Sequence, residues 1–425
     1  MAAAASLKRA GFQVMILDAN LYSTFQPLLY QVATAGLNPG DVSHPVGASA
    51  RRYRAKYRRG ELAAIDTGAR RAKLADGREF GYDYLIIATG MTASYFGIKG
   101  AAENTCGLYT RKDAIVLRDH FMAGIERLSS DVQKEFHVTV VGGGATGVEL
   151  AGALAELRGV VLRSTFPDVD PGRLHVRLVE MAPSLLAPFP ERLQGYTLAQ
   201  LRKRGVEVLL NTRIEEVAPG RVVLGSGDST PSDLTVWAAG VAAPQAVTGW
   251  GLPQGKHGRI VVGSDLRVQG QDRIFAVGDI AINPDDPVPQ TAQPAIQMGK
   301  HAAKQILRLQ KAQPTESFSY FDKGDMATIG RRSAVVRLRH GLQLRGSLAW
   351  LAWLALHLFY LLGLRNRVTT LINLSWRYLA WGHGGAVIVG DDPSAPPPSA
   401  PPSSVSMAPT IPLEHAGGAN DTLDT

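Results

Sequence analysis

The chain has 425 residues, enough for two or three domains, and its 45% hydrophobic content suits large buried cores. Its net charge of +8 is spread along the sequence, so we expect no nucleic-acid partner, although the charge would suit an anionic membrane surface. The single cysteine, Cys106, excludes a disulfide framework, a C-x-x-C redox pair and a cysteine-ligated cluster, and we expect no metal site.

The chain opens with the second half of a dinucleotide-binding βαβ unit. Residues 2–10 are predicted to form the later turns of a helix, and residues 12–17 form a strand closed by Asp18. The carboxylate of Asp18 stands where such a unit binds a ribose. Because the sequence starts inside the helix, we expect the first strand and the glycine turn of this unit to be missing.

Two further segments complete the N-terminal part. Residues 51–59 are basic with two interleaved tyrosines, for which a solvated helix face or loop is favoured over a nucleic-acid patch. Residues 82–90 are a predicted buried strand that ends in Ala88, Thr89 and Gly90. Small residues at the end of a buried strand let the backbone pass close to a bound dinucleotide.

The central feature is residues 138–152, where a β-branched run enters a G-x-G-x-x-G turn and then a helix start of small residues. Gly142 permits the tight turn, Gly144 lets the backbone approach a pyrophosphate, and Gly147 lets the helix pack on the strand. The first N–H groups of the helix and its dipole favour the phosphates. With a strand before it and a helix after it, the turn is a strong dinucleotide-binding motif.

The next strand, residues 176–180, ends in Glu180, whose carboxylate would accept a hydrogen bond from a ribose 2′-hydroxyl. A carboxylate repels a 2′-phosphate, so the sequence predicts NADH and not NADPH. Glu180 lies further from the glycines than is usual, because residues 162–173 have the character of an inserted loop. A helix-capping or merely exposed Glu180 is the alternative.

The layout of the first unit then repeats. Residues 206–210 and 222–224 are predicted strands, and residues 234–240 form a buried strand that ends in Gly240. Residues 273–280 are a strand ending in Gly278 and Asp279, and residues 290–309 are a helix. This duplication predicts two nucleotide-binding domains.

The last third of the chain is more apolar. Residues 334–344 alternate roughly as one strand, and residues 348–364, about 17 in number, are apolar except for His357. Apolar residues between 368 and 379 then recur at helical spacing. We expect both helices to lie in a membrane interface, with a spanning helix and a buried core helix as alternatives. Residues 391–425, rich in Pro, Ser and Ala, are predicted to be a disordered tail.

Together these motifs resemble those of type II NADH dehydrogenase, the single-subunit NADH:quinone oxidoreductase of the two-dinucleotide-binding flavoprotein superfamily. The resemblance extends from about residue 7 to residue 389. The glycine turn, the Ala-Thr-Gly ending and the Gly-Asp ending mark the superfamily only. Residues 25–36, residues 292–297 and the Trp- and Leu-rich end with residues 363–367 are specific to the family.

The resemblance implies an α/β fold with two Rossmann-like dinucleotide-binding domains, one for FAD and one for NADH, and a C-terminal membrane-associating helical segment. The FAD-binding domain would comprise residues 1–110 and 245–325, and the NADH-binding domain residues 111–244. Residues 326–390 would form the membrane-associating region, followed by the tail at 391–425.

The resemblance also implies residue roles. Asp18 would bind the adenosine ribose of FAD, and Asp279 its ribityl chain or pyrophosphate. Glu149 would lie near the flavin and relay protons, although an ordinary first-turn acid is an equal alternative. Gln293 and Gln297 lie one turn apart on a helix and would contact quinone or flavin carbonyls. The expected cofactor-binding residues are Asp18, Gln26, Ala88, Thr89, Gly90, Gly142, Gly144, Gly147, Glu180, Gly240, Gly278 and Asp279.

The implied activity is hydride transfer from NADH to FAD, then two-electron transfer to a membrane quinone without proton pumping. The protein would lie on the cytoplasmic side of the inner membrane, as a monomer or a homodimer. A ferredoxin-reductase-like flavoprotein and an inactive or truncated NADH-binding membrane scaffold are the alternatives. Disulfide reductases and sulfide:quinone reductases need paired cysteines, and this chain has only Cys106.

Overall fold

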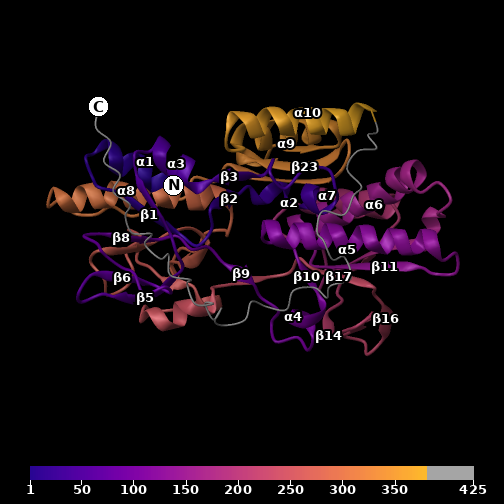
Figure 1. Ribbon diagram of the computed structural model, residues 1–425, viewed down its shortest axis with the longest axis horizontal. Coiled ribbons are helices and arrows are strands. Elements are labelled where there is room, and N and C mark those ends of the chain that lie inside the picture. Colours follow the sequence, from indigo (N-terminus) through magenta and orange to yellow (C-terminus); the bar gives the residue numbers. More distant parts are fainter. Residues whose placement is uncertain (381–425) are drawn as a thin grey trace, which may run out of the picture.

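A computed structural model describes residues 1–380, without the side chains of residues 160, 161, 163–165 and 377–380. The predicted tail at 391–425 and the end of the expected membrane-associating region lie outside the described residues. Figure 1 shows three groups of elements along the molecule. They are the N-terminal strands with α8 (Ala292–Gln310), a parallel sheet around β11 (Phe136–Val141), and a C-terminal group with α9 (Ser347–Tyr360) and α10 (Leu364–Ala380).

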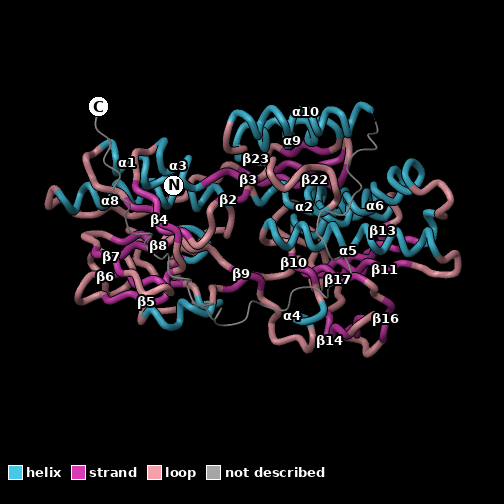
Figure 2. Tube along the Cα trace, viewed as in Figure 1, coloured by secondary structure: helices cyan, strands magenta, loops and turns pink. Residues whose placement is uncertain are grey.

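The parallel sheet has five strands in the order β10-β17-β11-β12-β13. Their bounds are β10 (Cys106–Gly107), β17 (Leu234–Trp237), β12 (Leu174–Val179) and β13 (Val206–Leu209). Helices α5 (Arg111–Ser130), α6 (Ala145–Thr165) and α7 (Glu191–Lys203) pack into its main core (Figure 2). The antiparallel strands β14 (Ile214–Ala218), β15 (Arg221–Leu224) and β16 (Ser229–Pro231) join a smaller core with the ends of β11 and β12. The central strands β11 and β17 are almost entirely buried, whereas β12 and β13 also carry exposed polar residues such as His175 and Glu207.

The expected inserted loop at residues 162–173 is wrong in its first part. Helix α6 continues to Thr165, and a short 3-10 turn, η2 (Pro171–Arg173), precedes β12. Leu162 is fully buried in the main core, so apolar packing extends the helix beyond the expected end. The long separation between the glycine turn and Glu180 is therefore mostly helix.

The N-terminal group contains two parallel pairs, β1 (Met15–Asp18) with β4 (Lys56–Arg59), and β8 (Leu85–Ile87) with β20 (Ile274–Ala276). The helix predicted at residues 2–10 is present as α1 (Ala2–Arg9), which packs on α8. An antiparallel sheet of β5 (Leu62–Asp66), β6 (Arg71–Leu74) and β7 (Glu79–Gly81) follows. The absence of a first strand stays a prediction.

Short elements connect these groups. The antiparallel pair β9 (Thr92–Ala93) and β18 (Val241–Ala242) lies between the N-terminal group and the five-stranded parallel sheet (Figure 1). The expected domain boundaries stay a prediction, but β10, which precedes residue 111, pairs with β17 in the NADH-side sheet. The remaining elements are β2 (Tyr22–Thr24), η1 (Gln26–Leu28), α2 (Leu29–Ala33), β3 (Ser43–Pro45), α3 (Val46–Arg52), α4 (Ala101–Asn104), η3 (Gln245–Trp250), η4 (Lys256–Gly258), β19 (Ile260–Val261), η5 (Gly278–Ile280) and β21 (Ala281–Ile282).

The C-terminal group is a three-stranded antiparallel sheet covered by two helices. Its strands are β22 (Gly324–Gly330), β23 (Ser333–Leu338) and β24 (Gln343–Arg345). The single strand expected at residues 334–344 is therefore a hairpin, because η6 (Arg339–Gly341) turns the chain with positive φ at its last two residues. The long apolar helix expected at residues 348–364 is also wrong, since α9 ends at Tyr360 and α10 starts after Gly363, where φ is +87°.

The C-terminal sheet packs directly on the nucleotide-binding part. A Cβ on Gly152 of α6 would overlap the carbonyl oxygen of Ile329, so only glycine lets β22 lie this close to α6. Trp353, Leu361 and Leu374 join the main core beneath the helices. Among the described residues, no helix is long and apolar enough to cross a membrane.

Candidate functional site

The glycine turn after β11 has the geometry of a phosphate cradle. The φ of Gly142 is +110°, and a Cβ there would lie 2.9 Å from the carbonyl carbon of Ala238. A Cβ on Gly147 would overlap the carbonyl oxygen of Gly142. At Gly144, by contrast, a Cβ would meet nothing within 4 Å, and no side chain caps this end of α6. The first N–H groups of α6 are therefore open to a ligand, as a pyrophosphate needs.

Glu180 is held against this turn. Its Oε2 accepts a hydrogen bond from the Gly143 N–H, and its Oε1 accepts one from the Ala182 N–H at 2.6 Å. The strand order places β11 beside β12, so the acid at the end of β12 reaches the turn at the end of β11. The structure thus brings Glu180 and the three glycines together. The role of Glu180 in selecting NADH over NADPH stays a prediction.

Gly240 follows the neighbouring strand β17 at the same edge of the sheet. Its φ is +49°, and a Cβ would overlap the ring of Phe96. Phe96 has a positive φ of 52° and an exposed ring, both unusual for phenylalanine. We did not identify Phe96 from the sequence, where nothing distinguishes it from a core phenylalanine.

A second edge gathers residues expected to bind FAD. Ala88, Thr89 and Gly90 follow β8, and Gly278 and Asp279 follow β20, which is its parallel neighbour. Gly90 and Gly278 both have left-handed φ values, +69° and +73°.

Tyr109, which we did not identify from the sequence, lies at this edge too. Its hydroxyl accepts a hydrogen bond from the Met91 N–H at 3.4 Å, and the Gln26 side-chain amide donates to the Tyr109 carbonyl at 3.1 Å. The contacts tie the segment that begins at Phe25 to the end of β8. The FAD-binding roles of these residues stay a prediction.

The two aspartates expected to bind FAD are partly withdrawn from water. Burial raises the pKa of Asp279, against the opposing effect of Arg259. No hydrogen bond to its carboxylate is found within residues 1–380. Burial also raises the pKa of Asp18, whose Oδ1 accepts a hydrogen bond from the Asn20 N–H at 2.8 Å. An unpartnered acceptor at the end of β20 fits a ligand with hydroxyl groups.

The two glutamines of α8 are in different situations. Gln297 makes a reciprocal pair with the backbone of Phe321: its amide donates to the carbonyl oxygen, and its oxygen accepts from the N–H, both at 3.0 Å. Gln293 is half-buried, and its side chain has no hydrogen bond to the described part of the chain. Gln293 is therefore free to bind a ligand, whereas Gln297 is occupied in holding the chain before β22.

Glu149 lies on α6, just after the glycine turn, and is only 8% exposed. Its Oε1 accepts a hydrogen bond from the Thr328 N–H of β22 at 3.2 Å. Burial raises the pKa of Glu149 to about 8, against the opposing effects of this N–H and of the Trp353 indole. The indole N–H lies near the carboxyl, but its geometry falls short of a hydrogen bond. Glu149 is therefore protonated at neutral pH.

Aromatic side chains of α9 continue from Glu149 toward the Phe25 segment. The Trp353 and His357 rings stack at 4.1 Å, and the His357 ring meets Phe25 edge-on at 6.2 Å. His357 Nδ1 lies 2.7 Å from the carbonyl oxygen of Trp353, and burial lowers the pKa of His357 to about 4. The neutral ring is consistent with an apolar environment. The sequence placed Trp353 and His357 only in an apolar helix, not at the site.

Cys106 is the only cysteine, and its thiol is buried. Burial, and to a smaller extent Asp113, raise the pKa of Cys106 to about 12. A thiol of such high pKa is a poor nucleophile at neutral pH, so Cys106 does not offer thiol–disulfide chemistry.

Comparisons with known proteins identify the family of the whole chain. The sequence profile of the pyridine nucleotide-disulphide oxidoreductase family matches residues 1–299. Type II NADH:quinone oxidoreductase Ndh of Mycobacterium tuberculosis is 35% identical over 408 residues, which cover 91% of this chain and 87% of that protein. The type II NADH:quinone oxidoreductase of Haemophilus influenzae is 31% identical, over 81% of this chain and 86% of its own length.

Solved structures support the fold. NDH2 from Plasmodium falciparum in complex with NADH superposes with a TM-score of 0.82 at 19% identity, covering 90% of this chain and 97% of that one. The sulfide:quinone oxidoreductase of Aquifex aeolicus reaches 0.72 at 17% identity, over 90% and 93%. At such low identity the likeness concerns the fold alone, and the predicted α/β class is confirmed. With the sequence relatives, it follows that the chain belongs to the pyridine nucleotide-disulphide oxidoreductase family and, within it, to the type II NADH:quinone oxidoreductases.

Proposed function

We propose that this chain is an FAD-dependent NADH:quinone oxidoreductase that does not pump protons. The observation that carries the proposal is the open glycine turn, with Glu180 beside it, in a chain whose relatives over most of its length are type II NADH:quinone oxidoreductases. The sequence relatives reported above are NADH:quinone oxidoreductases, which favours this activity over the ferredoxin-reductase-like and scaffold alternatives.

FAD supplies a carrier that accepts a hydride from NADH and passes two electrons to a quinone. For this cofactor the chain offers Asp279 as an unpartnered acceptor, the left-handed Gly90 and Gly278, and the Gln26–Tyr109 contact at the same edge. Asp18 offers a second carboxylate for the adenosine ribose. These residues fit the cofactor because they combine close backbone approach with acceptors that the protein itself leaves free.

The NADH site comprises Gly142, Gly144, Gly147 and Glu180. The open N-terminus of α6 binds the pyrophosphate, and the carboxylate of Glu180 accepts a hydrogen bond from the ribose 2′-hydroxyl. The hydrogen bonds from Gly143 and Ala182 hold Glu180 in position before the nucleotide arrives. The negative charge also disfavours a 2′-phosphate, so the enzyme selects NADH.

Glu149 is the proton donor at neutral pH, because its raised pKa keeps it protonated in a buried site. Trp353 and His357 exclude water on the side of Glu149 that faces α9. On α8, Gln293 has the free amide and is the quinone-binding residue, while Gln297 positions the backbone at Phe321. Quinone binding is thus assigned to α8 and proton supply to α6.

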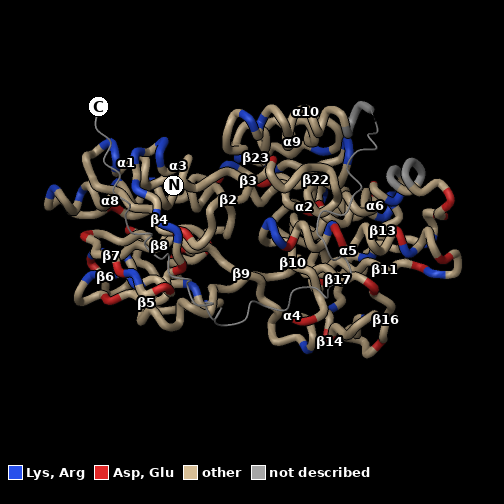
Figure 3. The backbone as a smooth tube through the Cα atoms, viewed as in Figure 1, with Lys and Arg blue, Asp and Glu red and all other residues tan. Residues whose placement is uncertain are grey.

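The α9–α10 surface is the membrane-docking face, and its occupant is an anionic lipid bilayer. Both helices lack acidic residues, and Figure 3 shows basic positions at the end of α10 nearest the α9–α10 turn. Such an apolar face with arginines at its border suits a helix pair lying in the headgroup region. We place the protein on the cytoplasmic side of the inner membrane. The large exposed side chains of the α9–α10 surface are Leu348, Leu351, Leu356, Phe359, Leu362, Leu364, Val368, Leu371, Ile372 and Trp376.

A pair of glycine variants tests the proposed activity. At Gly144 the Cβ of a valine would have no protein atom within 4 Å, and the φ of −71° suits valine, yet the side chain would fill the space where a pyrophosphate approaches the turn. Gly159→Val, later on the same helix and also in open space, is the matched control. We expect the full-length, FAD-loaded Gly144→Val protein to lose flavin reduction by NADH, and the control to keep it. Equal flavin reduction and quinone turnover in both variants would contradict the proposal. Light scattering of the same preparations distinguishes monomer from homodimer.

A further inference from the structure

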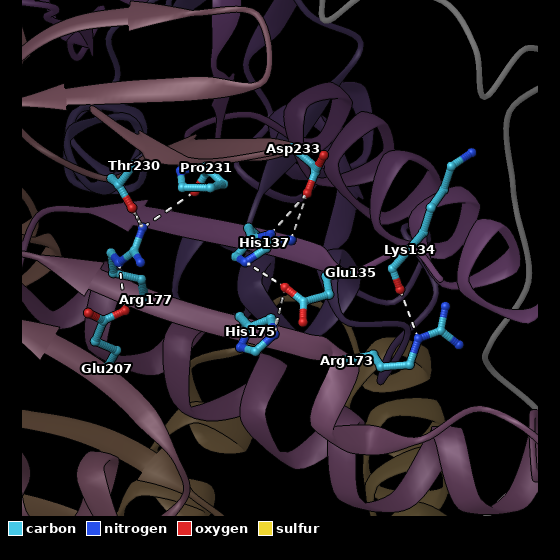
Figure 4. A network of polar contacts seen from close by, with 10 residues as sticks. All are labelled: Lys134, Glu135, His137, Arg173, His175, Arg177, Glu207, Thr230, Pro231 and Asp233. Atoms are coloured by element: carbon cyan, nitrogen blue, oxygen red, sulfur yellow. Dashed lines mark hydrogen bonds and ion pairs between the residues drawn. The ribbon is translucent and has the colours of Figure 1, made fainter. Parts of the chain in front are cut away.

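Four ionisable side chains meet at the edge of the parallel sheet opposite the glycine turn (Figure 4). In the register of β11 and β12, His137 lies directly across from His175, so their side chains share one face. The two imidazole rings stack at 4.6 Å with an interplanar angle of 12°. Glu135, just before β11, and Asp233, just before β17, approach the rings from either side. This cluster has no part in the proposed NADH:quinone activity.

The distances within the cluster are close to those around a tetrahedral zinc ion. Glu135 Oε2 lies 3.5 Å from His137 Nε2 and 3.6 Å from His175 Nε2, and all three atoms lie within 4.8 Å of one another. With metal–ligand bonds of about 2.0–2.1 Å, tetrahedral ligand atoms are about 3.3–3.4 Å apart. Because the lone pair of an imidazole nitrogen lies in the ring plane, the His175 ring, whose side chain is 45% exposed, must leave its stacked orientation before both Nε2 atoms can face one ion.

Asp233 orients one of the candidate ligands. Its Oδ2 accepts a hydrogen bond from the His137 backbone N–H at 2.8 Å and lies 3.5 Å from His137 Nδ1. The Asp233 N–H in turn donates to the His137 carbonyl at 2.8 Å. A proton on Nδ1 then faces the Asp233 carboxylate and leaves the Nε2 lone pair free on the side of Glu135. Metal-binding histidines are commonly oriented by such a carboxylate.

The loop before Glu135 is also held in place. The guanidinium of Arg173 donates to the carbonyl oxygen of Lys134 at 2.8 Å (Figure 4). It also donates to the carbonyl oxygens of Leu128, at 3.0 Å, and of Asp131. This clamp fixes the backbone from which Glu135 projects, so little ordering remains to be done when an ion binds. The side chain of Glu135 is 57% exposed, which leaves solvent access for a water as fourth ligand.

We propose that His137, His175 and Glu135 form a zinc site, with Asp233 as a positioning residue. Two imidazoles and one carboxylate suit a borderline-soft divalent ion and not Mg²⁺ or Ca²⁺, which prefer oxygen ligands. The ion links β11, β12 and the loop before β11. It binds at the N-terminal edge of the sheet, whereas the nucleotide turn is at the C-terminal edge, so it stabilises the NADH-side domain and does not enter the redox reaction.

The test titrates ZnCl2 into chelator-treated, FAD-loaded, full-length protein and follows binding by calorimetry and stability by thermal melting. We expect saturable binding of one ion and a rise in melting temperature that MgCl2 does not reproduce. His175→Ala, at the exposed ring, should remove most of the affinity. Asp233→Asn should weaken it by about 10- to 100-fold, since it loses the orienting charge and keeps the ligands.

His257→Asn is the control, because it removes an imidazole far from the cluster at a positive φ that asparagine tolerates. It should bind zinc like the unaltered protein. Co²⁺ provides a second readout, because a tetrahedral site gives an intense visible spectrum that should disappear in His175→Ala. The proposal is overturned if the unaltered protein shows no saturable zinc binding, or if His175→Ala and His257→Asn bind zinc equally well.

Discussion

The buried carboxyl of Glu149 predicts how stability depends on pH. An ordinary glutamate has a pKa of 4.5, whereas the pKa of Glu149 is raised to about 8 by burial. Between these two values the folded chain holds a proton that the unfolded chain has released. Stability therefore falls as the pH rises from 4.5 toward 8, and it becomes independent of this group above pH 8.

Glu149→Gln removes the ionisation and keeps the shape. The glutamine oxygen can still accept the hydrogen bond from the Thr328 N–H, which lies 3.2 Å from Oε1 in the native chain. Each pH unit over which only the folded state holds the proton is worth ~1.4 kcal/mol, so from pH 6 to pH 9 the native protein loses ~2–3 kcal/mol that the variant does not lose. The difference between the two stability curves isolates this one carboxyl.

The assay is chemical denaturation of both proteins at several pH values between 6 and 9. We expect the variant to gain stability relative to the native protein as the pH rises. Glu156→Gln is the control. Glu156 lies on the same helix and its carboxylate also accepts a hydrogen bond from a backbone N–H, that of Arg331, but its side chain is only half-buried. Parallel curves for the native protein and Glu149→Gln would refute the inference that Glu149 is protonated in the folded chain.

Three further experiments address the nucleotide, the quinone and the membrane. Glu180→Ala should weaken NADH binding by about 10- to 150-fold, as expected for a lost charge-assisted hydrogen bond of ~1.5–3 kcal/mol, and should reduce the preference of the enzyme for NADH over NADPH. Unchanged Michaelis constants for both nucleotides would exclude Glu180 from the site. In stopped-flow measurements, Gln293→Ala should slow flavin reoxidation by quinone and leave flavin reduction by NADH unchanged, and an equal loss in both half-reactions would argue for a structural role. Gln297→Ala should instead lower the melting temperature, because it removes the two hydrogen bonds to the Phe321 backbone. Val368→Glu, at a site 46% exposed on α10, should reduce binding to anionic vesicles by at least about tenfold, whereas Val132→Glu, at a site 73% exposed in the nucleotide-binding part, should leave this binding unchanged. Equal vesicle binding by the two variants would show that the α9–α10 surface is not the docking surface.

The glycine turn could be predicted because its requirements are local. Gly142 and Gly147 are needed where the chain turns and where a helix meets the strand just before it, and both close contacts involve residues near in sequence or on the adjacent strand. The ends of β8 and β20 were predictable for the same reason, since small residues at a strand end have a local meaning. Local spacing also identified α10 as amphipathic.

The remaining residues depend on packing between distant segments. Phe96 lies over Gly240, and Tyr109 lies beside Gly90, only because separate strands end at a common edge. The proposed zinc ligands were not predicted, because His137 and His175 meet through the register of two strands, which their separation in the sequence does not disclose. The extended end of α6 was missed because tertiary packing overrode the local pattern. The turn at Gly363 has a local signal, a glycine with a φ of +87°, which we did not use in the prediction.

The C-terminal group contributes to the candidate site as well as carrying the proposed membrane-docking face. An acid in the first turns of a helix is normally exposed and favoured as an anion by the helix dipole. Glu149 departs from this because β22 and Trp353 of α9 cover it, and β22 can approach α6 only because Gly152 lacks a Cβ. The C-terminal group that carries the proposed membrane-docking face therefore also sets the protonation of the proposed proton donor. Removing residues 326–380 should change the chemistry of Glu149 as well as the proposed attachment to the bilayer.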